Sequence, residues 1–113
     1  MKFILVLMML LSAMYANVAV IQDVKVYKNS ATYNFAVRIL HKDSGWKHYV
    51  NRYEVLDKEG NILATRTLWH PHEHEQPFTR SLSGVKLSGM KTVWIRANDS
   101  VDGYSELYEI ALP

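Results

Sequence analysis

The stretch TYNFAVRI, residues 32–39, decides the fold, because its side chains alternate between large apolar ones and smaller or polar ones. Tyr33, Phe35, Val37 and Ile39 fall on one side of an extended chain, since successive side chains of a β-strand point to opposite faces. The intervening Thr, Asn, Ala and Arg fall on the other side. The stretch therefore predicts a strand with one face in a core and one toward water, in a well-specified register.

The same period of two dominates the rest of the chain, and no segment has the spacing of an amphipathic helix. Short runs of β-branched and aromatic residues are separated by Gly, Asn, Asp and Pro. The turn at 57–61 contains Gly60 and predicts an antiparallel hairpin, whereas 69–77 carries two prolines and is predicted as loop or edge. The predicted strands cover residues 20–27, 32–39, 48–56, 62–68, 78–85, 92–97 and 104–112. Seven short strands predict an all-β, seven-stranded antiparallel sandwich of the immunoglobulin or fibronectin type III kind.

Residues 1–16 have the layout of a signal peptide. Lys2 precedes an apolar run over residues 3–11, and smaller residues follow it. We expect cleavage after Ala16, with Ala13 and Ala19 as alternative positions and an uncleaved membrane anchor as the competing interpretation. A single β-sandwich domain over residues 17–113 is then exported to the periplasm or secreted, with no stable membrane span after cleavage.

Composition narrows the classes of function. The formal charge is +2 and falls to +1 when Lys2 leaves with the leader, which is too little for a surface that tracks nucleic-acid phosphates. The chain has no cysteine, so disulfides, thiolate metal sites and cysteine nucleophiles are excluded. No nucleophile elbow, ordered Ser–His–acid set or glycine-rich phosphate loop is present, and we expect the protein not to be an enzyme.

Two sets of residues carry a resemblance to known proteins. The stretches 53–57, 60–63 and 93–97 resemble fibronectin type III and related immunoglobulin-like modules. The motif His-Pro-His-x-x-Glu-Gln-Pro-Phe-Thr-Arg-Ser-Leu, residues 70–82, is similar to that of a family of small exported bacterial proteins without an assigned biochemical activity. The resemblance implies a sandwich fold and export, and it implies no reaction.

The predicted topology brings three loops to one end of the sandwich. These loops hold all five histidines together with several acids. Imidazole and carboxylate are the ligands that a borderline divalent metal such as zinc or copper takes. Alternating extended residues lie about 7 Å apart, so the His-rich loop needs a further ligand from another loop. The predicted metal ligands are His70, His72, His74, His48 and Asp99.

Two other interpretations of the same end remain open. In one, the histidines are ordinary polar loop residues. In the other, the end is a docking surface for an envelope protein, a peptide or a glycan, because loops on a rigid sandwich commonly carry binding functions. We expect Arg80 to pair with Glu75 or Asp99, and Trp69 and Trp94 to pack on the core, while Trp46 either packs there or binds a partner. The residues assigned to this second kind of binding are Trp46, Glu75, Arg80 and Tyr104.

Overall fold

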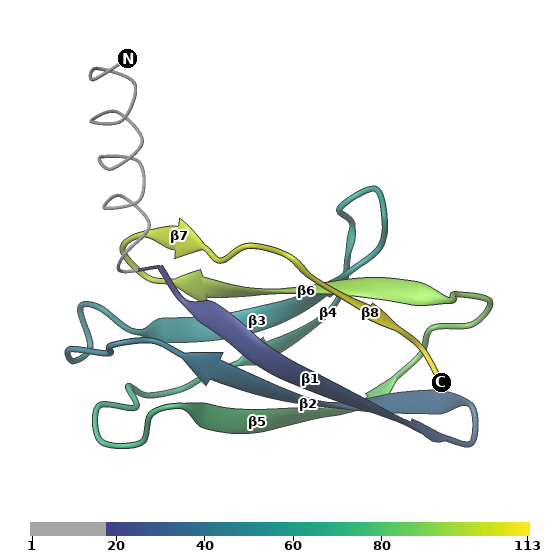
Figure 1. The fold of residues 1–113 in the computed structure, drawn as a ribbon, viewed down its shortest axis with the longest axis horizontal. Helices are drawn as coiled ribbons and strands as arrows, with labels where there is room; N and C mark the ends of the chain where they lie inside the picture. The colour runs from purple at the N-terminus through teal and green to yellow at the C-terminus, as the bar shows by residue number, and fades with distance from the viewer. Residues whose placement is uncertain (1–17) are drawn as a thin grey trace, which may run out of the picture.

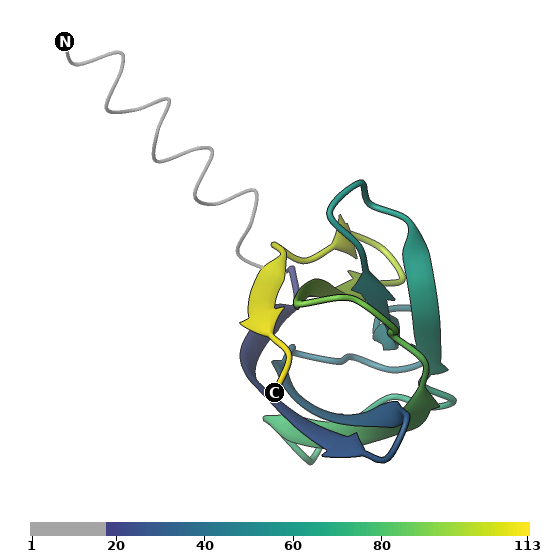
Figure 2. The same ribbon diagram turned by 90° about the vertical axis from the view of Figure 1, so that its right-hand side faces the viewer.

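The computed structural model describes residues 18–113 and consists of two antiparallel β-sheets without a helix. The predicted leader and its cleavage site after Ala16 lie outside the described residues. The strands are β1 Val20–Asn29, β2 Thr32–Leu40, β3 Val50–Leu56, β4 Ile62–Thr67, β5 Phe78–Val85, β6 Thr92–Asp99, β7 Gly103–Tyr104 and β8 Tyr108–Ala111. One sheet has the order β1-β2-β5, and the other has the order β4-β3-β6-β7, with β8 also paired to β6. Figures 1 and 2 show the two sheets on either side of the interior.

The alternation in β2 produces the predicted burial. Tyr33, Phe35, Val37 and Ile39 are buried, whereas their neighbours along the strand are partly or fully exposed. The facing sheet contributes Tyr53, Val55, Val93, Ile95 and Ala97, which are fully buried. The predicted hairpin between β3 and β4 and the predicted loop over 69–77 are both confirmed.

The last predicted strand, residues 104–112, is two strands rather than one. Ser105 interrupts it by using its side chain in the ladder, since the Ser105 Oγ accepts the Ala97 backbone N–H at 2.9 Å. The Ser105 N–H still donates to the Ala97 carbonyl at 2.8 Å, so the segment stays attached to β6 while its backbone turns away. Regular pairing resumes at Tyr108.

A cross-sheet hydrogen bond adds to the apolar core. Tyr53 on β3 has no exposed surface, and its hydroxyl donates to the Arg80 carbonyl on β5 at 2.9 Å. Burial raises the pKa of the Tyr53 hydroxyl, so the group remains a neutral donor. The two sheets are therefore joined by a directional contact as well as by packing.

Candidate functional site

Three loops meet at one end of the sandwich, on the left in Figure 1. They join β2 to β3, β4 to β5, and β6 to β7. The Ser100 N–H of the third loop donates to the Tyr49 carbonyl of the first at 2.9 Å. The His72 N–H of the second donates to Asp43 Oδ2 of the first at 2.6 Å. The loop contacts predicted from the strand order are therefore present.

Asp43 holds the first two loops together. Its carboxylate is fully buried and faces the His41 ring at Nδ1 (2.5 Å), while it accepts the backbone N–H groups of Val50 (3.2 Å) and His72 (2.6 Å). The Gln76 side chain adds a second link, since its Oε1 accepts the His41 N–H and its Nε2 donates to the His72 carbonyl. His41 is consequently held both at its ring, by Asp43, and at its backbone N–H, by Gln76.

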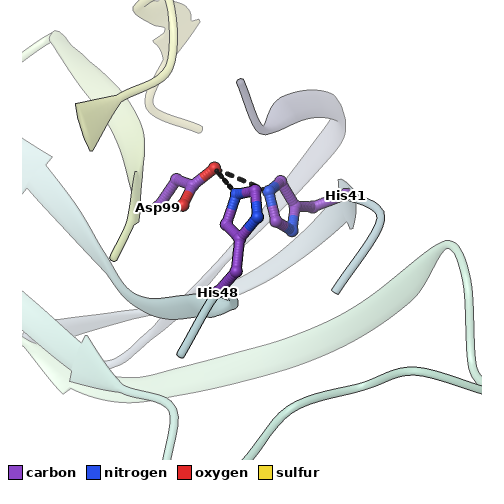
Figure 3. Close-up of side chains that lie close together, drawn as sticks. All are labelled: His41, His48 and Asp99. Carbon is purple, nitrogen blue, oxygen red and sulfur yellow. Dashed lines mark hydrogen bonds and ion pairs between the residues drawn. The ribbon is translucent and has the colours of Figure 1, made fainter. Parts of the chain in front are cut away.

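Beyond His41 lies Asp99, the last residue of β6. Figure 3 shows one Asp99 oxygen, Oδ2, facing two imidazoles, with His41 Nε2 at 2.7 Å and His48 Nε2 at 2.9 Å. The side chains of His41 and Asp99 are almost completely buried, whereas His48 is 25% exposed. Among residues 18–113, these three form the one group of three or more His, Asp or Glu side chains whose ligand atoms all lie within 4.8 Å of one another.

A tight turn presents His48 to this group. The His48 N–H donates to the Gly45 carbonyl and the His48 carbonyl accepts the Ser44 N–H. Gly45 has φ +102°, a conformation that residues with a Cβ rarely adopt. Asp102 completes the outer side, with its Oδ2 at 3.2 Å from His48 Nε2.

The His41 ring faces carboxylate oxygens at both of its nitrogens, and a neutral imidazole cannot donate to both. A neutral imidazole has one N–H and one lone pair, yet both ring nitrogens of His41 face carboxylate oxygens. If Nδ1 donates to Asp43, the lone pair of Nε2 points at a lone pair of Asp99. Either a second proton on the ring or a metal ion between Nε2 and Asp99 removes this repulsion.

The electrostatics of the group favour charged side chains. The hydrogen bond to Asp99 raises the pKa of His48, although partial burial opposes this. Burial by itself would raise the pKa of Asp99, but hydrogen bonds from the Val101 N–H, His48 and His41 outweigh burial and lower it. A carboxylate that stays ionised in the interior is a strong ligand for a cation.

The donor set fits a divalent transition metal. Two imidazole nitrogens and one carboxylate oxygen are a known zinc-binding combination, and Asp43 faces the other ring nitrogen of His41, as carboxylates that orient a metal-bound histidine do. The observed N–O separations are those of hydrogen bonds, and ligand atoms around a tetrahedral zinc ion lie about 3.3 Å apart. Binding a metal therefore requires His41 and Asp99 to separate by about 0.6 Å.

The three histidines of the predicted His-rich site lie elsewhere. His72 is buried and stacks on Phe78, with ring centroids 4.1 Å apart, and burial lowers its pKa. Neither of its ring nitrogens has a hydrogen-bond partner. His70 packs beside it with centroids 5.0 Å apart, and His74 is exposed. Of the predicted ligands, the structure brings together His48 and Asp99.

The other predicted binding residues have structural contacts or lie free on the surface. Arg80 pairs with Glu75 at 2.8 Å, as one of the two predicted pairings requires. Tyr104 accepts a hydrogen bond from Arg52 and lies under the Arg96 guanidinium. These contacts place Tyr104 against charged side chains of the five-stranded sheet.

The predicted packing of Trp69 is wrong, because this side chain is 74% exposed. The loop that follows β4 carries it away from the interior. Trp46 is 68% exposed and meets Tyr49 edge to face, so it does not pack on the core either. The loop end therefore presents two tryptophans to solvent.

The predicted ligand set lacks one member of the group, His41, and the two acids that contact the group, Asp43 and Asp102. The predicted ligand set instead centres on residues 70–74, because His70, His72 and His74 alternate there. The signal that identifies His41 and Asp43 is their place directly after β2, where the chain leaves the core and its side chains are still buried. A ligand set drawn from strand ends would have included both.

Comparison with known proteins adds one relative. A protein of Halomicrobium mukohataei named "Putative lipoprotein" is 34% identical over 70 residues, which cover 62% of this chain and 34% of the relative. The chain thus spans about a third of that protein's length. No protein-family model and no solved structure matches the chain. Within residues 18–113 there is no helix with the length and apolar character needed to cross a bilayer.

Proposed function

We propose that the protein is an exported, non-catalytic binding module that coordinates a divalent transition metal through His41, His48 and Asp99. The observation that carries the proposal is the buried His41 ring held between two carboxylates. Asp43 would orient the ring, and Asp102 adds negative charge beside His48 on the solvent side. Zinc and copper(II) suit this mixture of nitrogen and oxygen donors.

Charge balance supports a divalent ion in particular. The buried carboxylates of Asp43 and Asp99 carry two negative charges when ionised. Two neutral imidazoles with one divalent metal neutralise them, as do two protonated imidazoles without a metal. Metal and protons therefore compete for the same ring nitrogens, and binding should release protons.

Calorimetric titration with zinc, copper and nickel tests this proposal on protein expressed as the full chain and purified without a histidine tag. We expect saturable binding of one metal per chain, with proton release that appears as a dependence of the heat on buffer. His41→Gln should lower the affinity by tenfold or more, whereas His70→Gln and His74→Gln, as matched controls, should not. If metal binding is lost in the two controls but not in His41→Gln, the site lies in the His-rich loop. If the wild-type protein shows no saturable binding, the proposal is rejected.

Fold type and location belong to the same proposal. We assign the sandwich to the fibronectin type III and immunoglobulin group, supported by a strand order in which the first, second and fifth strands form one sheet. We infer a periplasmic or secreted location from the leader-like residues 1–16, and the name of the lipoprotein relative supports export.

A second candidate function is docking to an envelope protein. It is favoured by the exposure of Trp46 and Trp69 at the loop end, because tryptophan is over-represented among residues that dominate binding energy. Affinity capture from an envelope extract with a chelator present separates the two functions. One stoichiometric partner that is lost with Trp46→Ala and Trp69→Ala would favour docking, and capture that requires metal would favour the metal site.

A further inference from the structure

A hollow of about 700 Å³ lies directly beside the His–Asp group. Its lining includes the residues His41 and His48, together with Val20 and Leu40. Val20 and Leu40 face each other in the register of β1 and β2, and they are 52% and 40% exposed. The hollow therefore joins the candidate metal ligands to an uncovered apolar wall.

The partial exposure of His48 would leave a bound cation accessible from the hollow. Asp99 and His41 are enclosed, whereas His48 is 25% exposed and Asp102, which lies beside it outside the ligand set, is 32% exposed. Three protein ligands leave at least one position of a zinc-like ion open, as in sites that bind an external molecule. Because the partly exposed His48 lies on the lining of the hollow, a molecule within it can approach that position.

The lining also defines the chemistry of the molecule. Lys42 is the one Lys or Arg among the residues that line the hollow in the described part of the chain, so it can balance one negative charge. The acids Asp43 and Glu73 on the same lining disfavour a second charge. Val18, Val20 and Leu40 offer contact to a short hydrocarbon chain.

We propose that this hollow binds a small monocarboxylate with an apolar chain, whose carboxylate takes the open position on the metal. The inference rests on the proposed metal site. Cobalt(II) is a suitable probe, since it takes the place of zinc and its visible absorption responds to a change of ligand.

The experiment titrates the cobalt-loaded protein with hexanoate, acetate and succinate and follows the visible spectrum. We expect hexanoate to change the spectrum at a concentration about tenfold lower than acetate, because four additional CH₂ groups reach the apolar wall. Succinate, with its second charge, should bind more weakly than hexanoate. Equal effects of hexanoate and acetate, or no spectral change with any of the three acids, would overturn the inference while leaving the metal site intact.

Matched variants separate the hollow from the metal site. Leu40→Ser should retain cobalt binding and remove most of the preference for hexanoate, whereas Leu107→Ser, an equally apolar and 58% exposed position outside the lining of this hollow, should keep it. Lys42→Gln should weaken the binding of all three acids. Failure of the wild-type protein to bind cobalt would instead reject the metal proposal itself, and this inference with it.

Discussion

Replacement of Asp43 by asparagine probes how much of the stability depends on the junction of the loops. The substitution keeps the size of the side chain but turns one accepting oxygen into an NH₂ donor. Asp43 Oδ1 faces His41 Nδ1 and accepts the Val50 N–H, and Oδ2 accepts the His72 N–H. In either orientation of the amide, at least one buried N–H then faces another donor.

The expected cost follows from these contacts. A buried donor left without a partner costs about 1–3 kcal/mol, and loss of the charge-assisted bond to His41 adds about 1 kcal/mol. We expect Asp43→Asn to lower the free energy of unfolding by about 2–4 kcal/mol. For a domain of this size, the corresponding fall in the melting temperature is about 10–25 °C.

Urea denaturation at pH 7 with a chelator present measures this cost without a contribution from metal. The matched control is Asp23→Asn, the same exchange on the edge strand β1, which should change stability by less than about 0.5 kcal/mol. If Asp43→Asn also stays within 0.5 kcal/mol of the wild type, the carboxylate does not hold the loops as described. In the same variant, metal affinity should fall about 10- to 100-fold, because the support of His41 is removed.

Three further predictions concern the dependence of stability on pH, the backbone conformation at Gly45, and the hydrogen bond between the two sheets. The raised pKa of His48 means that its pairing with Asp99 stabilises the metal-free protein fully below about pH 6.5 and is lost as the pH rises through the folded-state pKa. Chemical denaturation from pH 5.5 to 8.5 should therefore show a loss of less than about 1 kcal/mol that is absent in His48→Gln, and identical curves would contradict the pairing. Gly45→Ala forces a residue with a Cβ to φ +102° and should cost about 1–2 kcal/mol in thermal unfolding, so an unchanged melting temperature would show that the turn relaxes freely. Tyr53→Phe removes the donor to the Arg80 carbonyl and should cost about 1 kcal/mol in urea denaturation with an unchanged m value, whereas a neutral result would mean that the hydrogen bond adds nothing net.

Much of the architecture could be predicted from the period-two pattern. The strands around Phe35 and Ile95 follow from alternation, because one face of each must enter the core. The hairpin at Gly60 and the loop over 69–77 follow from turn chemistry and proline. The split of the last strand could not be predicted in this way, since it depends on a serine hydroxyl that replaces a backbone acceptor.

The location of the candidate metal site could be predicted from the sequence, but only some of its residues could. The strand order brings distant loops together, and this places His48 near Asp99 although 51 residues separate them. Which histidines face inward depends on side-chain packing. His72 stacks on Phe78, whereas His41 is held by Asp43, and the residue type alone does not distinguish these two environments.

The interruption at Ser105 has a consequence for how copies of the protein behave at high concentration. A long, straight outer strand offers a row of unpaired amide and carbonyl groups onto which another molecule can add, and such addition begins fibrous aggregation. At the edge of the five-stranded sheet formed by β7 and β8, the row of backbone groups is broken after Tyr104. Ser105 Oγ occupies one bonding position there, and the backbone departs from the sheet over the next residues. The break leaves segments of two and four residues, too short to template a neighbouring chain.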